Sequence, residues 1–251
     1  MKNWIAFCVA ALFPLTLWAA DIQATLQWSQ RVEVSAPVSG TVQAVNVREG
    51  DIVKKGQVLL SLDSTAYRAR VDESRSEIVR LNAEAEEDKR DLEREQELYD
   101  RTVAAAAERD QAKLKLVRSQ SALAEARARL RQNQKALDDT FLRAPFGAVV
   151  LMRRAEPGQS VAAGLQPQML LTLARSGEMI ARMLLPSSQV DNFKTGQALS
   201  VNIAAASYAG KIQTLGLEPI KIKVEQLYPV DVIFRSKDIF RAGTTALVKL
   251  P

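Results

Sequence analysis

The stretch APVSGTVQAVNVREGDIVKKGQVLLSLD, residues 36–63, decides the fold because the chain carries it twice. Its opening residues, APVSGTV, reappear as APFGAVV at residues 144–150, an offset of 108 positions. The same offset continues without a gap and then slips by three, so that residues 59–62 match residues 170–173. Chance is a poor explanation for such a match, which indicates an internal repeat. The further matched pairs are Gly50 with Gly158, Val53 with Val161, and Gly56 with Gly164.

Each copy of the repeat has the pattern of short, half-buried β-strands. Small or apolar residues alternate with polar ones, and glycines stand where tight turns need a positive φ. Neither copy can bury its apolar face alone, so the two copies are expected to form one small β-sandwich. The long segment Ser64–Thr140 interrupts this sandwich.

The repeat resembles the two halves of biotinyl and lipoyl carrier domains. In those carriers the acceptor lysine lies on the tight turn between the halves, in a Met-Lys-Met or Asp-Lys-Ala type of sequence. No such tripeptide follows Asp63 here, because Ser64–Thr140 replaces the turn. The chain is therefore predicted to carry no cofactor. A biotinyl or lipoyl group found by intact mass would restore the carrier-subunit alternative.

The segment Ser64–Thr140 is predicted to form a helical hairpin. It contains neither glycine nor proline and is rich in alanine, leucine, glutamate and arginine, which all favour helix. Two heptad series follow each other along it, symmetric about residue 104. Two antiparallel helices of about 35 residues, each on the order of 50 Å long, are therefore expected to meet at the uncharged stretch 102–107. The series are Val71, Ile78, Ala85, Leu92 and Tyr99, and Leu116, Leu123, Leu130 and Leu137.

The outgoing helix is acidic and the returning helix is basic. Residues 64–103 hold 12 acidic and 8 basic side chains, and residues 104–140 hold 5 acidic and 8 basic ones. This difference favours ion pairs between the helices, although each exposed pair adds only tenths of a kcal/mol. The apolar seam is therefore expected to set the register.

The residues after Arg175 predict a small closed β-barrel. Five short strands are expected, and a helix N-capped by Ser187 and ended by Gly196 follows the first of them. Residues 22–34 are expected to add an edge strand and the entry to the sandwich. The predicted strands are Met179–Leu185, Ala198–Ile203, Lys211–Leu217, Leu227–Phe234 and Ala246–Leu250.

Together these segments predict a multi-domain α+β protein. A split lipoyl-like β-sandwich is interrupted by a long antiparallel α-helical coiled-coil hairpin and is followed by a small β-barrel. The predicted order is a signal peptide (1–20), an N-terminal strand with the first lipoyl half-motif (21–63), the α-helical hairpin (64–140), the second half-motif (141–175) and the β-barrel (176–251).

The first 20 residues have the features of a secretory signal peptide. Lys2 supplies a positive charge, residues 4–18 form an apolar run, and cleavage is expected near Ala19 or Ala20. The run is shorter than the roughly 20 apolar residues of a transmembrane helix. An uncleaved inner-membrane anchor is the alternative.

The composition excludes several kinds of chemistry. The chain has no histidine, and its only cysteine, Cys8, lies in the predicted signal peptide. Histidine bases, cysteine nucleophiles and the common zinc sites are therefore excluded, and no catalytic or metal-binding residue is predicted. The net charge of +5 comes from basic residues interleaved with acidic ones, so nucleic acid is not an expected partner.

Two groups of residues invite a functional interpretation but fit structural roles better. Methionines in the predicted strands are expected to fill cores rather than bind soft metals. The acidic clusters at 86–88 and 138–139 lie on heptad helices, so they are expected to form solvated faces rather than catalytic carboxylate pairs. The methionines are Met152, Met169, Met179 and Met183.

The order of the segments resembles the periplasmic adaptors, or membrane fusion proteins, of the HlyD-like type. Besides the first half-motif, the resemblance includes LRAPFGAVVLMRRAEPGQSV (142–161), LLPSSQVDNFKTGQALSVNI (184–203) and FRAGTTALVKLP (240–251). It implies a non-catalytic periplasmic protein, associated with the inner membrane, that bridges an inner-membrane transporter to an outer-membrane TolC-like channel for efflux or secretion. It also implies a homo-oligomer, either a trimer or a hexamer.

The resemblance further implies a partner-binding site at the hairpin tip. Channel-binding members carry an arginine, a leucine four residues on and a serine seven residues beyond that. This chain has Arg94, Leu98 and, in place of the serine, Ala105. The arginine is expected to donate hydrogen bonds and the leucine to fill a groove. Arg101 and Val103 complete the predicted site.

Two further expectations concern the partner and the motion. Adaptors of proton-driven pumps continue into a membrane-proximal domain, whereas this sequence stops after the barrel, so an ABC-type or another transporter is expected. Hinges are expected near residues 63–66, 140–143 and 174–177. The alternative function is a periplasmic binding or scaffold module that holds a ligand or an envelope component without any transporter.

Overall fold

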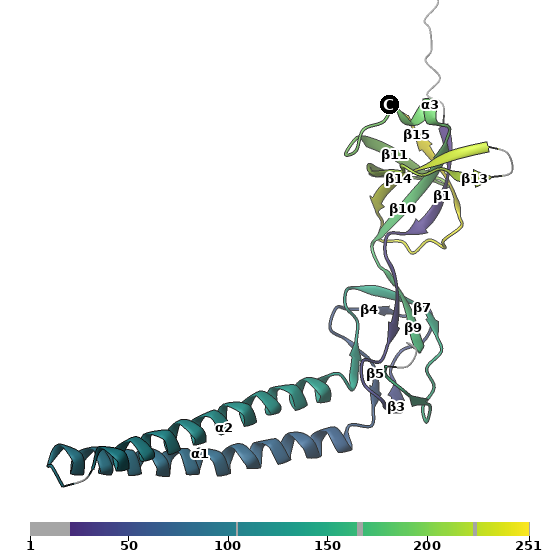
Figure 1. The fold of residues 1–251 in the computed structure, drawn as a ribbon. Coiled ribbons are helices and arrows are strands. Elements are labelled where there is room, and N and C mark those ends of the chain that lie inside the picture. Colours follow the sequence, from purple (N-terminus) through teal and green to yellow (C-terminus); the bar gives the residue numbers. More distant parts are fainter. Residues whose placement is uncertain (1–20, 104, 165–167, 223–224, 251) are drawn as a thin grey trace, which may run out of the picture. The chain divides into compact units, whose positions relative to one another are not determined.

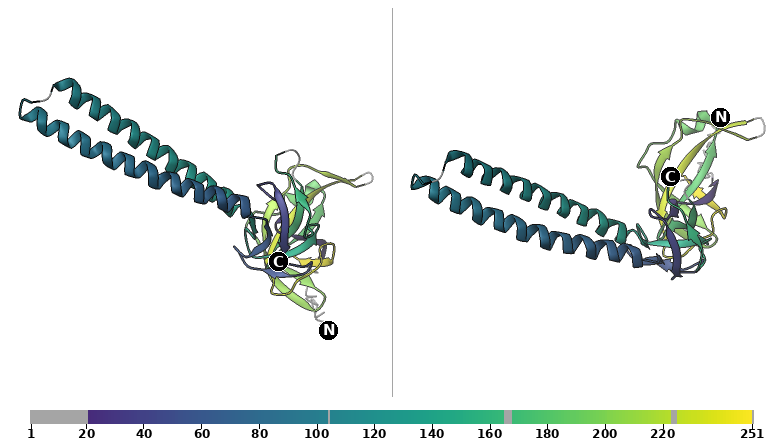
Figure 2. Two further views of the ribbon diagram at one scale, coloured as in Figure 1. Left: turned by 90° about the horizontal axis from the view of Figure 1, so that it is seen from below. Right: turned by 60° about the horizontal axis from the view of Figure 1, so that its bottom comes forward.

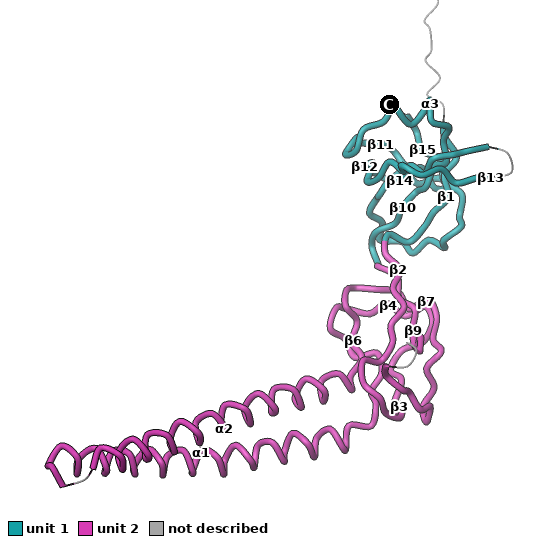
Figure 3. The backbone as a smooth tube through the Cα atoms, in the orientation of Figure 1, with its two compact units in different colours: residues 1–29, 176–251 teal, residues 30–175 magenta. Residues whose placement is uncertain are grey.

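The structure, a computed structural model, describes residues 21–103, 105–164, 168–222 and 225–250. The predicted signal peptide therefore lies outside the described residues. The chain forms two compact units, one of residues 30–175 and one that combines the chain up to Ser29 with the chain from Ser176 onward (Figure 3). Within the described ranges, no helix has the length and apolar character needed to cross a membrane.

Two four-stranded sheets form the β-sandwich, and each sheet draws two strands from residues 31–62 and two from residues 141–175. One sheet has the order β2-β9-β7-β4 and the other the order β6-β5-β3-β8. The offset of 108 residues carries β3 onto β7 and β4 onto β8, so the repeat in the sequence is a repeat of strands. The bounds are Arg31–Ser35 (β2), Gly40–Val45 (β3), Ile52–Val53 (β4), Val58–Leu62 (β5), Phe141–Arg143 (β6), Ala148–Arg153 (β7), Ser160–Val161 (β8) and Met169–Arg175 (β9).

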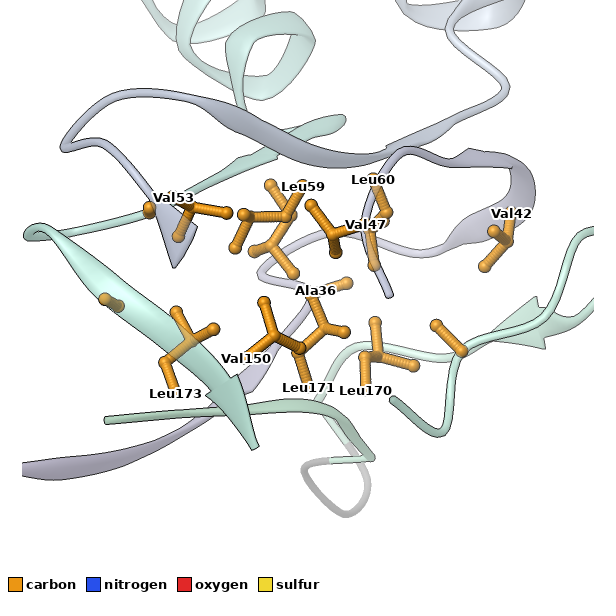
Figure 4. Packing of buried hydrophobic residues seen from close by; sticks show 14 of the residues in the cluster. Ala36, Val42, Val47, Val53, Leu59, Leu60, Val150, Leu170, Leu171 and Leu173 are labelled. Atoms are coloured by element: carbon orange, nitrogen blue, oxygen red, sulfur yellow. The ribbon is translucent and has the colours of Figure 1, made fainter. Parts of the chain in front are cut away.

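The two copies bury each other in the core of the sandwich. Leu59 of the first copy and Val150 of the second belong to one buried cluster (Figure 4). Both are at most 1 % exposed, which confirms that the copies share a single core. Gly50 and Gly158, which the repeat matches, have φ angles of 90° and 85° and form equivalent turns.

A long helical hairpin leaves the sandwich after β5 and returns to it at β6. Its helices are α1 (Thr65–Asp100) and α2 (Ala106–Asp138), which run side by side over their whole length (Figures 1 and 2). The predicted fold-back point, residue 104, lies outside the described residues, and in the sequence it falls between the two helices. The helix propensity and the heptad pattern of this segment therefore predicted both helices, and the predicted ends lie within a few residues of the observed ones.

Hydrogen bonds fasten the start of α1 to the sandwich. The N–H of Asp63 donates to the carbonyl of Thr41 at 2.8 Å, and the phenol of Tyr67 donates to the carbonyl of Ser39 at 2.7 Å. A joint that moves freely would have to break these bonds. They argue against the hinge expected at residues 63–66.

The seam between the helices has the predicted antiparallel register. Leu81 and Ala85 of α1 pack with Leu123 and Ala126 of α2 in one buried cluster. Ala85 and Leu123 are equally far from residue 104, as the heptad series requires. The seam also uses a second set of heptad positions, which include the buried polar residues Ser74, Asp88 and Ser119.

Two residues of the hairpin depart from the sequence prediction. Asp88, assigned to a solvated acidic face, is only 2 % exposed, because it lies in the seam and pairs with Lys115 of α2. Tyr99, assigned to the apolar seam, is 36 % exposed. Its ring centroid lies 4.5 Å from the guanidinium carbon of Arg109. The seam near the tip is therefore more polar than the heptads predicted.

The second unit contains a closed six-stranded β-barrel. Its strands pair in the order β10-β1-β15-β11-β12-β14, and a pairing of β14 with β10 closes the ring, while β13 pairs with β14 outside it. The closed barrel is confirmed, with one strand more than predicted. The bounds are Asp21–Trp28 (β1), Glu178–Leu185 (β10), Ala198–Ile203 (β11), Ala206–Leu215 (β12), Ile220–Ile222 (β13), Glu225–Arg235 (β14) and Thr245–Lys249 (β15).

Two local predictions for this unit are wrong. The strand predicted at an edge is β1, but it forms part of the barrel wall and pairs with β10 on one side and β15 on the other. It is held there because Ala24 and Leu26 supply core side chains that are at most 2 % exposed. The helix expected to run to Gly196 is the four-residue α3 (Ser187–Val190). Pro186 takes its N-cap position, so Ser187 does not cap it.

The methionines divide between cores and surface. Met179 and Met183 are at most 3 % exposed and fill the barrel core, as predicted. Met152, on β7 of the sandwich, is 36 % exposed, so the prediction that it fills a core is wrong. It projects from the last part of a strand whose earlier residues supply the core.

Candidate functional site

Backbone hydrogen bonds close the turn at the hairpin tip. The N–H of Val103 donates to the carbonyl of Leu98 at 3.0 Å, and the N–H of Thr102 donates to that of Tyr99 at 2.9 Å. Thr102 has a φ of 61°, which is uncommon for a residue other than glycine. The bonds satisfy terminal carbonyls of α1 and bring Val103 back to the level of Leu98.

Ala105 occupies the N-cap position of α2. Its backbone is extended, with φ of −78° and ψ of 149°, which is the usual conformation of an N-cap residue. Its methyl group cannot accept a hydrogen bond from the first turn. The carboxylate of Glu108 accepts one from the N–H of Ala105 at 3.3 Å, so half of a capping box is present.

Three of the five predicted site residues line one groove near the tip. These are Arg94 and Leu98 of α1 and Val103 of the turn. Arg94 is exposed, Leu98 is half-buried, and Val103 is 75 % exposed. The groove is completed by Asp91, Glu95, Glu108, Gln111, Ala112 and Lys115.

The other two predicted residues do not line this groove. The guanidinium of Arg101 pairs with Glu97 one turn earlier on α1. Ala105 lies at the start of α2, where its contribution is to the helix cap. The structure thus brings together the arginine and leucine of the family pattern and places the serine position at a helix end.

Two cations meet Asp91 at the groove. Arg94 lies 3.1 Å from one of its oxygens, and Lys115 of the opposite helix lies 3.4 Å from the other. The ammonium of Lys115 also lies 2.8 Å from Asp88. The hydrogen bond from Lys115, with a smaller contribution from Ser119, lowers the pKa of Asp88 against the opposing effect of desolvation. Hydrogen bonds to Asp88 and Asp91 raise the pKa of Lys115, so both partners are charged at neutral pH.

The sequence interpretation missed Lys115, which lines the groove, and Asp88, which does not line it but pairs with Lys115. Lys115 belongs to the helix that returns from the tip, and it reaches the groove only through the antiparallel pairing. The antiparallel register could have revealed Lys115. Residues 93 and 115 are equally far from residue 104, so they are expected to lie opposite each other on the two helices. Asp88 was overlooked because a carboxylate among other carboxylates suggests a surface position.

The groove is suited to recognition by contact. It combines hydrogen-bond donors from two cations with the apolar side chains of Leu98 and Val103, a combination that is common where proteins bind each other. In the ranges that the structure describes, no three or more histidine, cysteine, aspartate or glutamate side chains gather to hold a metal ion.

The chain is similar in sequence to proteins that are named for export and efflux. Residues 30–170, more than half of the chain, match the family described as CzcB-like, barrel-sandwich hybrid domain. The macrolide export protein MacA of Escherichia coli O157:H7 is 25 % identical over 210 residues, which cover 77 % of this chain and 57 % of MacA. The efflux pump periplasmic linker BepD of Brucella suis biovar 1 is 26 % identical over 170 residues, which cover 65 % of this chain and 43 % of BepD. The chain thus spans about half the length of these relatives.

A solved structure shares the fold. The membrane fusion protein Spr0693 from Streptococcus pneumoniae R6 superposes with a TM-score of 0.71 at 17 % identity, covering 92 % of this chain and 97 % of Spr0693. The predicted fold class is therefore confirmed. The predicted resemblance to membrane fusion proteins is confirmed as well, and the chain belongs to the CzcB-like barrel-sandwich hybrid domain family.

Proposed function

We propose that this protein is the periplasmic adaptor of a tripartite efflux or secretion system. In this role it bridges an inner-membrane transporter to an outer-membrane TolC-like channel and catalyses no reaction. One observation carries the proposal: a hairpin on the order of 50 Å long interrupts the sandwich of a family whose relatives are named as export proteins and periplasmic linkers. An arm of this length suits a protein that spans a gap between partners.

The tip groove is proposed as the contact with the channel. Arg94 is exposed and keeps hydrogen-bond donors available beyond its pairing with Asp91. Leu98 and Val103 would lose their remaining exposure on docking, as anchor residues do. Arg101 and Ala105 flank this groove at the turn and complete the proposed site.

The remaining partners follow from the same role. We place the protein in the periplasm, associated with the inner membrane, with an ABC-type or another transporter as its inner partner. Adaptors of this kind surround a central transporter, so a homo-oligomer, a trimer or a hexamer, is part of the proposal. The closed barrel is the part proposed to face the transporter.

The arrangement of the chain suggests where movement passes through such an adaptor. The hairpin and the sandwich form one compact unit, and hydrogen bonds fasten the hairpin at its base. The chain crosses to the barrel unit at residues 29–30 and 175–176. We therefore assign the joint to the two places where the chain crosses between the units, residues 174–177 and residues 29–30. The sandwich and the hairpin would then move together as one body.

The test is site-specific capture at the tip. In a Cys8→Ser background, a cysteine at Ala105 carries a photo-crosslinker, and captured proteins are identified by mass spectrometry from cells that express the full chain. A cysteine at Gln132, which is exposed near the base of α2, is the matched control. Capture of an outer-membrane channel from position 105 and not from position 132 supports the proposal.

Substitutions in the groove sharpen this test. Arg94→Ala and Leu98→Ala are expected to reduce capture of the channel. Arg90→Ala, which removes an exposed arginine one turn nearer the base, is expected to leave it unchanged. Capture of only a second copy, or of soluble ligand-bearing proteins, would contradict the adaptor role and favour a transporter-independent binding or scaffold module.

A further inference from the structure

The buried part of the hairpin seam ends well before the tip. On α1 the last buried residue is Asp88, and on α2 the first is Ser119. None of the residues described between them, 89–103 and 105–118, is buried. Roughly 20 Å of each helix therefore has no fully buried side chain, and the seam residues there, such as Leu92 and Leu116, are only half-buried.

A charged contact across the seam stands at this border. The ammonium of Lys115 lies 2.8 Å from Asp88 and 3.4 Å from Asp91. The side chain of Asp88 is 3 % exposed, whereas that of Lys115 is 59 % exposed. A buried carboxylate without a partner is strongly disfavoured, so Asp88 in this position requires Lys115 beside it.

This contact differs from the other ion pairs of the hairpin. Among the residues that the structure describes, the pairs made by Lys115 join α1 to α2, and every other hairpin pair lies within one helix. The opposite charges of the two helices therefore meet mainly at one place. Beyond it, the stacking of Arg109 on Tyr99 also joins the helices, but that contact is partly open to solvent.

We propose that Asp88 and Lys115 form a clasp that holds the outer third of the hairpin closed and thereby positions the tip groove. The groove takes Arg94 and Leu98 from α1 and Ala112 and Lys115 from α2. Its two sides are adjacent only while the helices are held together at this level. Asp88 and Lys115 are thus positioning residues for the tip. The use of the groove rests on the proposed function, but the clasp is a property of the free chain.

Distance measurement in the full chain tests the clasp directly. Spin labels replace Glu93 and Lys113 in a Cys8→Ser background; both are exposed and line a second groove that Lys115 does not enter. The native chain is expected to give one narrow distance. Lys115→Gln and Asp88→Asn are expected to add a second, longer distance. Arg90→Gln, which removes an ion pair within α1, is the matched control and is expected to behave as the native chain.

Amide exchange separates a local opening from loss of the whole hairpin. In both clasp variants, exchange is expected to accelerate in residues 92–116 and to stay unchanged around Leu81 and Leu123. Acceleration along the entire hairpin in Lys115→Gln would contradict the clasp, because that result means general unfolding. Unchanged distances and exchange in both variants would overturn it outright.

Capture at position 105 then tests the positioning role. Reduced capture of the channel by Asp88→Asn, a change outside the groove lining, in a chain whose base stays protected, supports it. Opening of the tip with undiminished capture would show that the clasp does not position the groove. If the native chain captures no channel, the proposed function fails, and the spin-label distances still decide whether the clasp exists.

Discussion

The side-chain amide of Asn133 donates a 2.8 Å hydrogen bond to the hydroxyl of Ser74, although 59 residues separate the two in the chain. Ser74 is 5 % exposed and donates its own proton to the carbonyl of Arg70 at 3.0 Å. The midpoint of Ser74 and Asn133 falls between residues 103 and 104, in agreement with the apolar pairs. Sliding one helix along the other would leave these groups without partners, so this polar layer supports the register that the apolar layers set.

Removing one member of this layer should weaken the hairpin. Asn133→Ala leaves the Ser74 hydroxyl without its donor and is expected to lower the free energy of unfolding by about 1 kcal/mol. Urea unfolding followed by helical circular dichroism measures the change. Gln134→Ala, on the exposed face of α2, is the control and should have little effect. Equal losses from both substitutions would show that the seam bond is not the cause.

A serine at position 105 should strengthen the start of α2. Ala105 already has the backbone conformation of an N-cap, so a serine hydroxyl can accept a hydrogen bond from the first turn without rearrangement. Ala105→Ser is expected to raise the free energy of unfolding by about 1 kcal/mol. Ala106→Ser, one residue inside the helix, is the control and should give no gain. A similar gain at both positions would exclude capping as the explanation.

The clasp should be stable at neutral pH and fail in acid. Its hydrogen bond from Lys115 lowers the pKa of Asp88, and a lowered pKa contributes stability above the unfolded value, about 3.9. That contribution is lost as the pH falls through the lower folded value. The separation of the Glu93 and Lys113 labels is therefore expected to stay constant from neutral pH to about pH 4 and to increase below it. In Asp88→Asn, where Lys115 keeps only its longer contact with Asp91, the change in distance over this acid range should be smaller, and an identical acid transition in that variant would contradict the assignment.

The closure of the barrel should depend on Arg182. Its guanidinium makes two hydrogen bonds of 2.7 Å to Asp231 across the β10–β14 pairing that closes the ring. Arg182→Ala leaves a carboxylate that is 8 % exposed without its partner, at an expected cost of about 2 kcal/mol. Thermal unfolding followed by the fluorescence of Trp28, the tryptophan within β1, measures the loss.

A double replacement distinguishes the ion pair from the packing of the barrel wall. Arg182→Leu combined with Asp231→Val removes both charges and is expected to recover most of the stability that Arg182→Ala loses. If the double variant is as unstable as the single one, the loss comes from packing rather than from an unpaired carboxylate.

The sequence predicts best where a pattern repeats many times. The offset of 108 residues and the heptads of the hairpin each rest on many positions, so single exceptions did not obscure them. The local signals around Ser187 were weaker, and the chain forms only one turn of helix there. The sequence analysis placed β1 at an edge because the alternating pattern of a single strand does not show which strands it pairs with.

The polar residues of the seam show a different limit. Ser74, Asp88 and Asn133 occupy heptad positions, but their residue types suggest exposure, and only their partners on the other helix explain why they lie in the seam. The tip groove has the same character. Arg94 and Leu98 follow from a linear pattern, whereas Lys115 joins them through a contact between residues far apart in the chain.

The length of the hairpin can change in steps of one heptad without altering its base or its tip. Its base is set by the pairing of β5 with β6 and by the bonds of Asp63 and Tyr67, and its end is set by a five-residue turn. Neither depends on how many heptads lie between them. Adding or removing seven residues in each helix, symmetrically about position 104, would change the length by about 10 Å and leave both ends intact. In the proposed adaptor, a different distance between the two partners would therefore be matched by a different number of heptads in the hairpin.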